Sequence, residues 1–135
     1  MDKKQGLIDA AKKVRERAHA PYSKFPVGAA LLTKSGQIFE GCNVENISLR
    51  LTMCAEEVAV GSAVAKGEKD FVAIAVVADS KEPVMPCGGC RQLLAEFNPD
   101  IEVISATPDG RIQTLSLGEL LPRAKQGILE HTHGD

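Results

Sequence analysis

The chain has 135 residues, 44% of them hydrophobic and 25% charged, and its formal net charge is −2. We expect a single domain over 1–135, and no apolar run approaches the ~20 residues that span a membrane. A surface that follows a polynucleotide backbone needs a basic stripe, whereas the basic cluster of this chain, at 12–17, is typical of a solvated helix face. We therefore expect a small-molecule substrate and no nucleic-acid or membrane partner.

The two ends of the chain are polar. Residues 1–5 lead into a helical pattern without the apolar segment of a signal peptide. We therefore expect a cytoplasmic location, where spaced cysteines indicate metal binding or catalysis more often than disulfides. Residues 130–135 are expected to form a loose tail, and His131 and His133 are not expected to bind metal there.

The first half of the chain predicts a helix, a hairpin and a second helix. Apolar residues recur at helical spacing from Leu7 to Ala18, and Pro21 limits that helix. Two apolar runs flank the turn at 34–36, which is typical of a β-hairpin. The predicted elements are a helix over 7–18, strands over 27–33 and 37–42, a polar stretch over 43–53 and a helix over 54–66.

The second half alternates strands and helices. The run 71–78 is almost continuously apolar, which predicts a buried central strand. After a loop over 79–86 we expect a helix over 87–97, strands over 101–106 and 111–115, and a short helix over 117–121. This order favours an α/β fold, a three-layer α-β-α sandwich with a mixed five-stranded sheet.

Three cysteines and one glutamate carry the clearest chemical signal: Cys54, Glu56, Cys87 and Cys90. Cys54 and Cys87 each open a predicted helix, and Cys90 lies three residues after Cys87, on the same helix face. Three thiolates can hold Zn²⁺ and leave its fourth position open to water, which is typical of a catalytic site. The partial positive charge of a helix N-terminus stabilises a thiolate. The pattern therefore predicts a zinc site that activates water.

Glu56 stands two residues after the first cysteine, where it can move protons instead of binding the metal. As a base it would take a proton from the activated water, and as an acid it would protonate a ring nitrogen and help an amine to leave. A Cys-x-Glu segment followed by Pro-Cys-x-x-Cys is the signature of zinc-dependent nucleobase deaminases.

A structural zinc site is the alternative. Cys42 would be its fourth ligand, but structural sites usually present two closely spaced cysteine pairs. Cys42 and Cys54 are separated by eleven residues, so the chain has one such pair, and Cys42 is also an ordinary buried residue type. Zinc binding without any deamination would favour this alternative.

Four segments resemble the small cytidine deaminases, in register from about residue 10 to 122: 21–31, 41–46, 54–56 and 86–92. The resemblance implies a homotetramer of the three-layer deaminase fold that acts in pyrimidine nucleoside salvage. It implies hydrolysis of cytidine or deoxycytidine to the uracil nucleoside and ammonia. By position, Cys54, Cys87 and Cys90 would bind zinc and Glu56 would be the proton shuttle.

The same resemblance implies the substrate contacts. Asn43 and Glu45 would hydrogen-bond the ribose hydroxyls, Phe25 would pack near the base, and Ala55 would lie against the substrate. Two polar residues that stand two apart in an extended segment can face the same way and hold a diol. Asn and Glu in a polar loop can equally serve backbone turns, so the residues themselves leave both roles open.

The chain departs from that family at several positions. Glu57 stands where the family usually has Arg, Leu49-Arg50 replaces Tyr-Gly, and Lys125 replaces a phenylalanine that closes over a neighbouring subunit's pyrimidine. One hypothesis is that Arg50 or Arg91 replaces the lost cation. Blasticidin S deaminases also lack that Arg, but they carry a basic residue where this chain has Gly89. Deamination of blasticidin S, or of another aminopyrimidine or heterocycle, is therefore an alternative activity.

Overall fold

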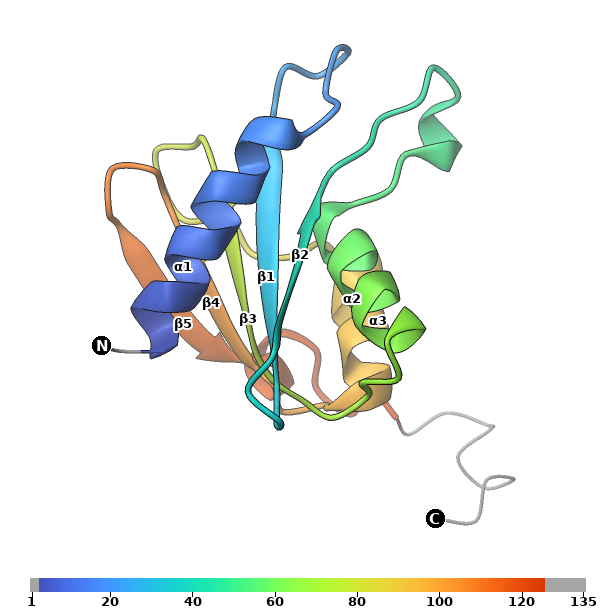
Figure 1. The fold of residues 1–135 in the computed structure, drawn as a ribbon, viewed down its shortest axis with the longest axis vertical. Coiled ribbons are helices and arrows are strands. Elements are labelled where there is room, and N and C mark those ends of the chain that lie inside the picture. Colours follow the sequence, from blue (N-terminus) through green and yellow to red (C-terminus); the bar gives the residue numbers. More distant parts are fainter. Residues whose placement is uncertain (1–2, 126–135) are drawn as a thin grey trace.

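The computed structural model describes residues 3–125, in which a five-stranded sheet lies between helices on its two faces (Figure 1). The strand order is β2-β1-β3-β4-β5; β3 and β4 pair in parallel and the other neighbours are antiparallel. The mixed five-stranded sheet predicted from the sequence is thus confirmed. The strands are β1 (Val27–Thr33), β2 (Ile38–Cys42), β3 (Phe71–Ala78), β4 (Glu102–Ala106) and β5 (Ile112–Ser116).

The helices form the two outer layers. One face of the sheet is covered by α1, and the other by α2 and α3 (Figure 1). The helices are α1 (Lys3–Val14), α2 (Ala55–Ala65), α3 (Gly88–Phe97) and α4 (Leu117–Leu120), with 3₁₀ turns η1 (Arg15–Arg17) and η2 (Leu49–Leu51). Within 3–125, no helix has both the length and the apolarity of a membrane span. The predicted tail at 130–135, with His131 and His133, lies outside the described residues.

Two hydrophobic cores explain why the central strands β1 and β3 are almost continuously apolar. Along β1, Ala29 and Leu31 pack with α2 and α3, whereas Ala30 and Leu32 pack with α1. Successive strand residues point to opposite faces, and helices cover both faces of this sheet. An uninterrupted apolar run is the expected sequence of such a strand.

The first helix differs from its prediction at both ends. It was expected over 7–18, but α1 begins at Lys3, ends at Val14 and continues as the 3₁₀ turn η1. The reason lies just beyond, where His19 pairs with the segment after β2. The His19 N–H donates to the Asn43 carbonyl at 2.9 Å, and the Glu45 N–H donates to the His19 carbonyl at 2.8 Å. This pairing needs an extended backbone, so the helix must end earlier. The 3₁₀ turn η2, inside the stretch 43–53, was not predicted.

A glycine sets the distance between β2 and α2. A Cβ atom on Gly41 would collide with the Ala55 carbonyl oxygen and would lie 2.5 Å from the Ala59 amide nitrogen, both in the backbone of α2. Backbone atoms cannot move aside as a flexible side chain can. Gly41 therefore allows α2 to lie directly against the edge of the sheet.

We predict that Gly41→Ala lowers the free energy of unfolding by about 2 kcal/mol or more, since α2 must shift outwards as in an overpacked core. Urea denaturation at a fixed protein concentration measures this. The matched control is Gly61→Ala, in α2, where an added Cβ has nothing within 4 Å. That variant should be neutral or more stable by up to about 1 kcal/mol. Equal effects of the two substitutions would contradict the close approach at Gly41.

Candidate active site

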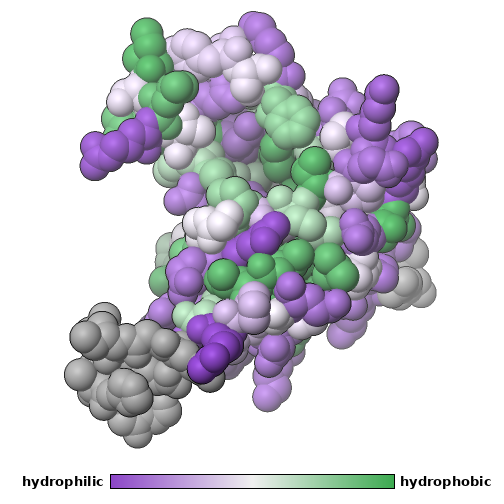
Figure 2. Space-filling model, turned by 180° about the vertical axis from the view of Figure 1, so that it is seen from behind, coloured by the Kyte–Doolittle hydropathy of each residue, from purple (hydrophilic) through white to green (hydrophobic). Residues whose placement is uncertain are grey.

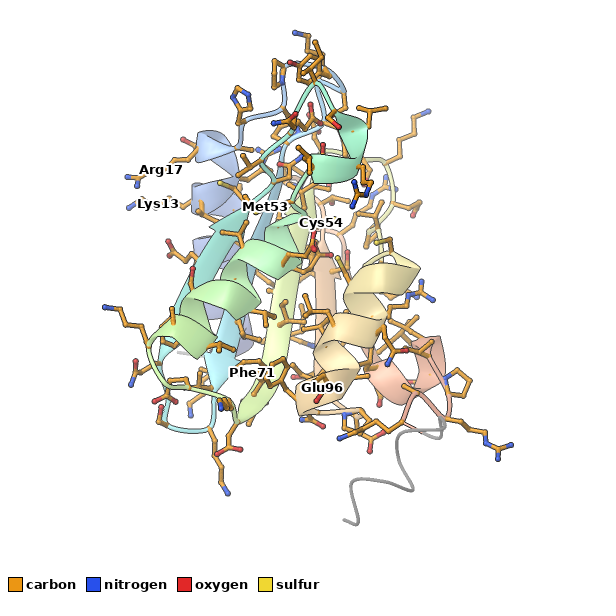
Figure 3. All side chains as sticks on the ribbon, turned by 90° about the vertical axis from the view of Figure 1, so that its right-hand side faces the viewer. Lys13, Arg17, Met53, Cys54, Phe71 and Glu96 are labelled. Carbon is orange, nitrogen blue, oxygen red and sulfur yellow. The ribbon has the colours of Figure 1, made fainter. Side chains whose placement is uncertain are left out.

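The three sequence-predicted cysteines meet where α2 and α3 begin. Cys54 is the residue before α2, Cys87 is the residue before α3, and Cys90 lies in the first turn of α3. Their Sγ atoms all lie within 4.8 Å of one another. Figure 3 shows Cys54 at the end of α2 that lies beside the beginning of α3. The structure therefore brings together, from two segments about thirty residues apart, a group of three sulfurs that can hold a metal ion.

The donor set of this cluster fits Zn²⁺. A tetrahedral zinc with Zn–S distances of about 2.3 Å separates its sulfurs by about 3.8 Å, so these thiols need only a small adjustment. The hydrogen bond between Cys90 and Cys54 raises the pKa of the Cys90 thiol, as does its burial, while the same bond lowers the pKa of Cys54. Thiols this close cannot all ionise without compensation, and a divalent cation between them supplies it.

Glu56 lies beside the cluster in the first turn of α2, with only 6% of its surface exposed. Burial, followed by the charge of Glu57, raises the pKa of its carboxyl. A raised pKa makes a carboxylate a stronger base, and it leaves more of the protonated form present near neutral pH to serve as an acid. Glu56 has the position and the environment of a general acid and base.

A small pocket opens over the cysteines and Glu56. Its volume is about 280 Å³, close to the ~300 Å³ at which small-molecule sites begin. The predicted residues Phe25, Asn43 and Ala55 contribute to its wall, whereas Glu45 does not. The residues that line it are Phe25, Val27, Asn43, Thr52, Cys54, Ala55, Glu56, Val76, Val84, Met85, Pro86, Cys87 and Cys90.

Asn43 is buried in the wall of the pocket and holds the beginning of β1. Its Oδ1 accepts from the Val27 N–H at 2.9 Å, and its Nδ2 donates to the Phe25 carbonyl at 3.0 Å. An amide group has two acceptor and two donor positions. One acceptor and one donor position of Asn43 therefore remain for another partner.

Glu45 anchors the loop that leads to Phe25. One carboxylate oxygen accepts from the N–H groups of Tyr22 and Ser23, at 3.0 and 3.1 Å, and the other accepts from the Ser23 hydroxyl. The Ser23 hydroxyl bond is the main reason that the pKa of Glu45 lies below its usual value. Of the four acceptor positions of a carboxylate, these bonds fill three.

Glu57 has a structural role that the sequence analysis missed. Its carboxylate accepts the Cys54 N–H at 2.7 Å, as the acidic residue of a helix capping box does. A glutamate three residues after a residue that opens a helix is the spacing of a capping box, and this spacing could have predicted the role of Glu57. The negative charge at this position therefore fixes the backbone that carries the first thiol.

The cation nearest to the cysteine motif in the chain is Arg91, which follows Cys90. Its side chain donates to the carbonyls of Pro86 and Leu120, at 2.7 and 3.0 Å. Arg50 is exposed on η2, which speaks against the hypothesis that it replaces the cation lost at Glu57. Lys125 lies against α3 of the same chain, where its ammonium is 3.5 Å from the Glu96 carbonyl oxygen. Figure 3 shows Glu96 at the end of α3 that is far from Cys54.

The predicted basic cluster of α1 lies away from this site. Figure 3 shows Lys13 and Arg17 projecting outwards from the opposite layer of the molecule, and both side chains are exposed. This position agrees with a solvated helix face.

A family model, described as the cytidine and deoxycytidylate deaminase zinc-binding region, matches residues 1–106. A cytidine deaminase of Halalkalibacterium halodurans is 52% identical over 122 residues, which cover 90% of this chain and 92% of the relative. A blasticidin-S deaminase of Bacillus cereus is 38% identical over 108 residues, which cover 74% of this chain and 76% of the relative.

The solved structures agree with the sequence comparisons. A crystal structure of cytidine deaminase from Burkholderia pseudomallei superimposes with a TM-score of 0.85 at 49% sequence identity, covering 88% of this chain and 96% of that one. The thiol cluster, the buried Glu56 beside it and these similarities lead to one conclusion. The chain belongs to the zinc-dependent cytidine and deoxycytidylate deaminase family and is an aminohydrolase with a zinc cofactor.

Proposed function

We propose that this enzyme hydrolyses cytidine and deoxycytidine to uridine and deoxyuridine, with release of ammonia, and that Cys54, Cys87 and Cys90 hold its Zn²⁺. The observation that carries the proposal is the single small pocket that contains both the three thiols and the buried carboxyl of Glu56. Two relatives named cytidine deaminase are 52% and 50% identical in sequence over most of the chain, and they support the choice of substrate.

Glu56 carries the proton steps in this proposal. Zn²⁺, when bound, supplies the Lewis acidity that makes a water ionise near neutral pH. Glu56 takes the proton of that water and delivers it to the ring nitrogen beside the carbon under attack. The carboxylate then carries the second proton of the water to the departing amine, so that cytidine and water become uridine and ammonia.

The nucleoside would be oriented by groups around the same pocket. The free donor and acceptor positions of Asn43 and the remaining acceptor position of Glu45 can serve the ribose hydroxyls. Phe25 offers an aromatic surface to the base. Ala55 begins α2, so its N–H has no partner within the helix and is available to a polar group of the base.

A homotetramer in the cytoplasm is the further part of the proposal. Next to the pocket, the segment around η2 projects from the molecule and carries exposed apolar side chains: Ile47 is 81%, Leu49 75% and Leu51 58% exposed. Figure 2 shows apolar surface on this projection, at the upper left, above a hollow in the molecular surface. Apolar exposure on this scale is typical of a protein interface, which supports association with further copies of the chain.

The substrate is tested by measuring ammonia release from cytidine, deoxycytidine, cytosine, 5-methylcytidine and blasticidin S side by side. We expect the two nucleosides to have the highest kcat/KM. A higher value for blasticidin S would instead favour the activity of the Bacillus cereus relative. A chain that holds zinc but deaminates none of these compounds would support the structural zinc alternative.

We predict that Glu56→Gln keeps its zinc but loses about 10²- to 10⁴-fold in kcat, because glutamine cannot carry a proton. Zinc content by atomic emission and ammonia release from cytidine measure the two properties separately. The matched control is Glu96→Gln, the same change at an exposed glutamate of α3, which should keep both zinc and turnover. Turnover retained in Glu56→Gln would contradict the proton-shuttle assignment.

We predict that Glu45→Gln lowers kcat/KM for cytidine by about 10- to 100-fold, the value of one hydrogen bond to a charged group. Free cytosine lacks the ribose, so its deamination should be unaffected. Ser23→Ala is the control, because it releases the loop while leaving the Glu45 carboxylate available. Equal losses on cytidine and cytosine, or the same losses in Ser23→Ala, would mean that Glu45 only shapes the loop.

A further inference from the structure

Arg91 holds the peptide groups on both sides of Cys87. Its side-chain Nε donates to the Pro86 carbonyl at 2.7 Å, and its backbone N–H donates to the Cys87 carbonyl at 2.9 Å. These two carbonyls belong to the peptide units that flank the Cys87 Cα atom. Because peptide units are planar, fixing both of them fixes the direction in which the Cys87 Cα–Cβ bond, which carries the sulfur, leaves the backbone.

The same guanidinium reaches a distant part of the chain. Its Nη1 donates to the carbonyl of Leu120 at 3.0 Å, the last residue of α4. Carbonyls at the end of a helix have no partner within it, so Leu120 accepts this bond without giving up another. The guanidinium presents its donors in a rigid planar fork, which lets one side chain hold two carbonyls in fixed relative positions.

The segment that follows β5 is docked on α3 by further contacts. Gln92 donates to the Ala124 carbonyl at 3.3 Å, and Leu120, Leu121 and Ala124 pack against the core beneath α2 and α3. Gln92 makes its bond from the exposed side of α3. The bond from Arg91 to Leu120 is different, because the same guanidinium also binds the Pro86 carbonyl, in the loop that leads to Cys87.

We propose that Arg91 is a positioning residue that couples the docking of residues 117–125 to the orientation of the backbone that carries the Cys87 thiol. The coupling is geometric: one planar group binds the carbonyls of Pro86 and Leu120, and Leu120 lies twenty-nine residues after Arg91 in the chain. The inference rests on the proposed function in one respect, namely that Cys87 is a ligand of the bound Zn²⁺.

The test uses the full chain loaded with zinc and the variants Arg91→Ala, Arg91→Lys and Gln92→Ala. The rate of zinc transfer to the chromogenic chelator 4-(2-pyridylazo)resorcinol reports how firmly the ion is held. Arg91→Ala should release zinc about 10- to 100-fold faster, the usual effect of losing a group that orients a metal ligand. Lysine keeps the charge but cannot hold two carbonyls, so Arg91→Lys should also release zinc faster. Gln92→Ala should resemble the wild type.

Amide hydrogen exchange provides the readout that does not depend on the metal. In the metal-free proteins, Arg91→Lys should speed exchange in both 79–87 and 117–125, while Gln92→Ala should affect only 117–125. Circular dichroism identifies any variant that fails to fold. If Arg91→Ala does not fold, Arg91→Lys alone tests the coupling.

Two results would overturn the inference. Wild-type zinc release in Arg91→Lys would mean that Arg91 acts through its charge alone. Faster exchange confined to one of the two segments would mean that they are not coupled. A wild-type chain that holds no zinc would instead overturn the proposed function, and hydrogen exchange in Arg91→Lys would still decide the coupling.

Discussion

The meeting of two helix N-termini at one edge of the sheet is the constraint on which the site depends. Strands β2 and β3 both pair antiparallel with β1, so they run in the same direction and end at the same edge. The chain leaves β2 for α2 and leaves β3 for α3. Both helices lie on the same face and begin at that edge, which is why cysteines at their beginnings come within 4.8 Å of one another.

Charge at this junction is arranged in a way that the cysteines alone do not reveal. Three thiolates bring three negative charges to one divalent cation, and two helix N-termini offset on the order of one charge. The carboxylate of Glu57 adds a negative charge, but it is engaged by the Cys54 N–H. The cation of Arg91 is bound to the carbonyls of Pro86, next to Cys87, and of Leu120 in α4. The backbone at Cys54 is thus held by an anionic side chain, and the backbone next to Cys87 by a cationic one.

Much of the fold could be predicted from local sequence. The run 71–78 predicted β3 to the residue, since a strand covered on both faces has no polar alternation to confuse its limits. The cysteine and glutamate motif likewise indicated the zinc chemistry, because ligand spacing is a local property. The early end of α1 depends instead on the pairing of His19 with residues near Asn43, which no local pattern reveals.

The wall of the pocket and the contacts of the Arg91 side chain could not be predicted from local sequence, for the same reason. Val84 and Met85 sit in what looked like an ordinary loop, yet they line the pocket because the Ser105 hydroxyl of β4 holds the Val84 carbonyl. Arg91 reaches Leu120 across twenty-nine residues. Contacts of this kind follow from topology, whereas the residues that make them have no distinctive spacing.

The most direct test of the central claim, that three thiols and one carboxyl form a zinc-dependent deaminase site, is metal removal and return. Ammonia release from cytidine is measured on the purified chain, after dialysis against a chelator, and after titration with Zn²⁺. The account predicts that activity is lost with the metal and returns in proportion to bound zinc, reaching its maximum at one ion per chain. Full activity in a chain shown to be free of metal would contradict it.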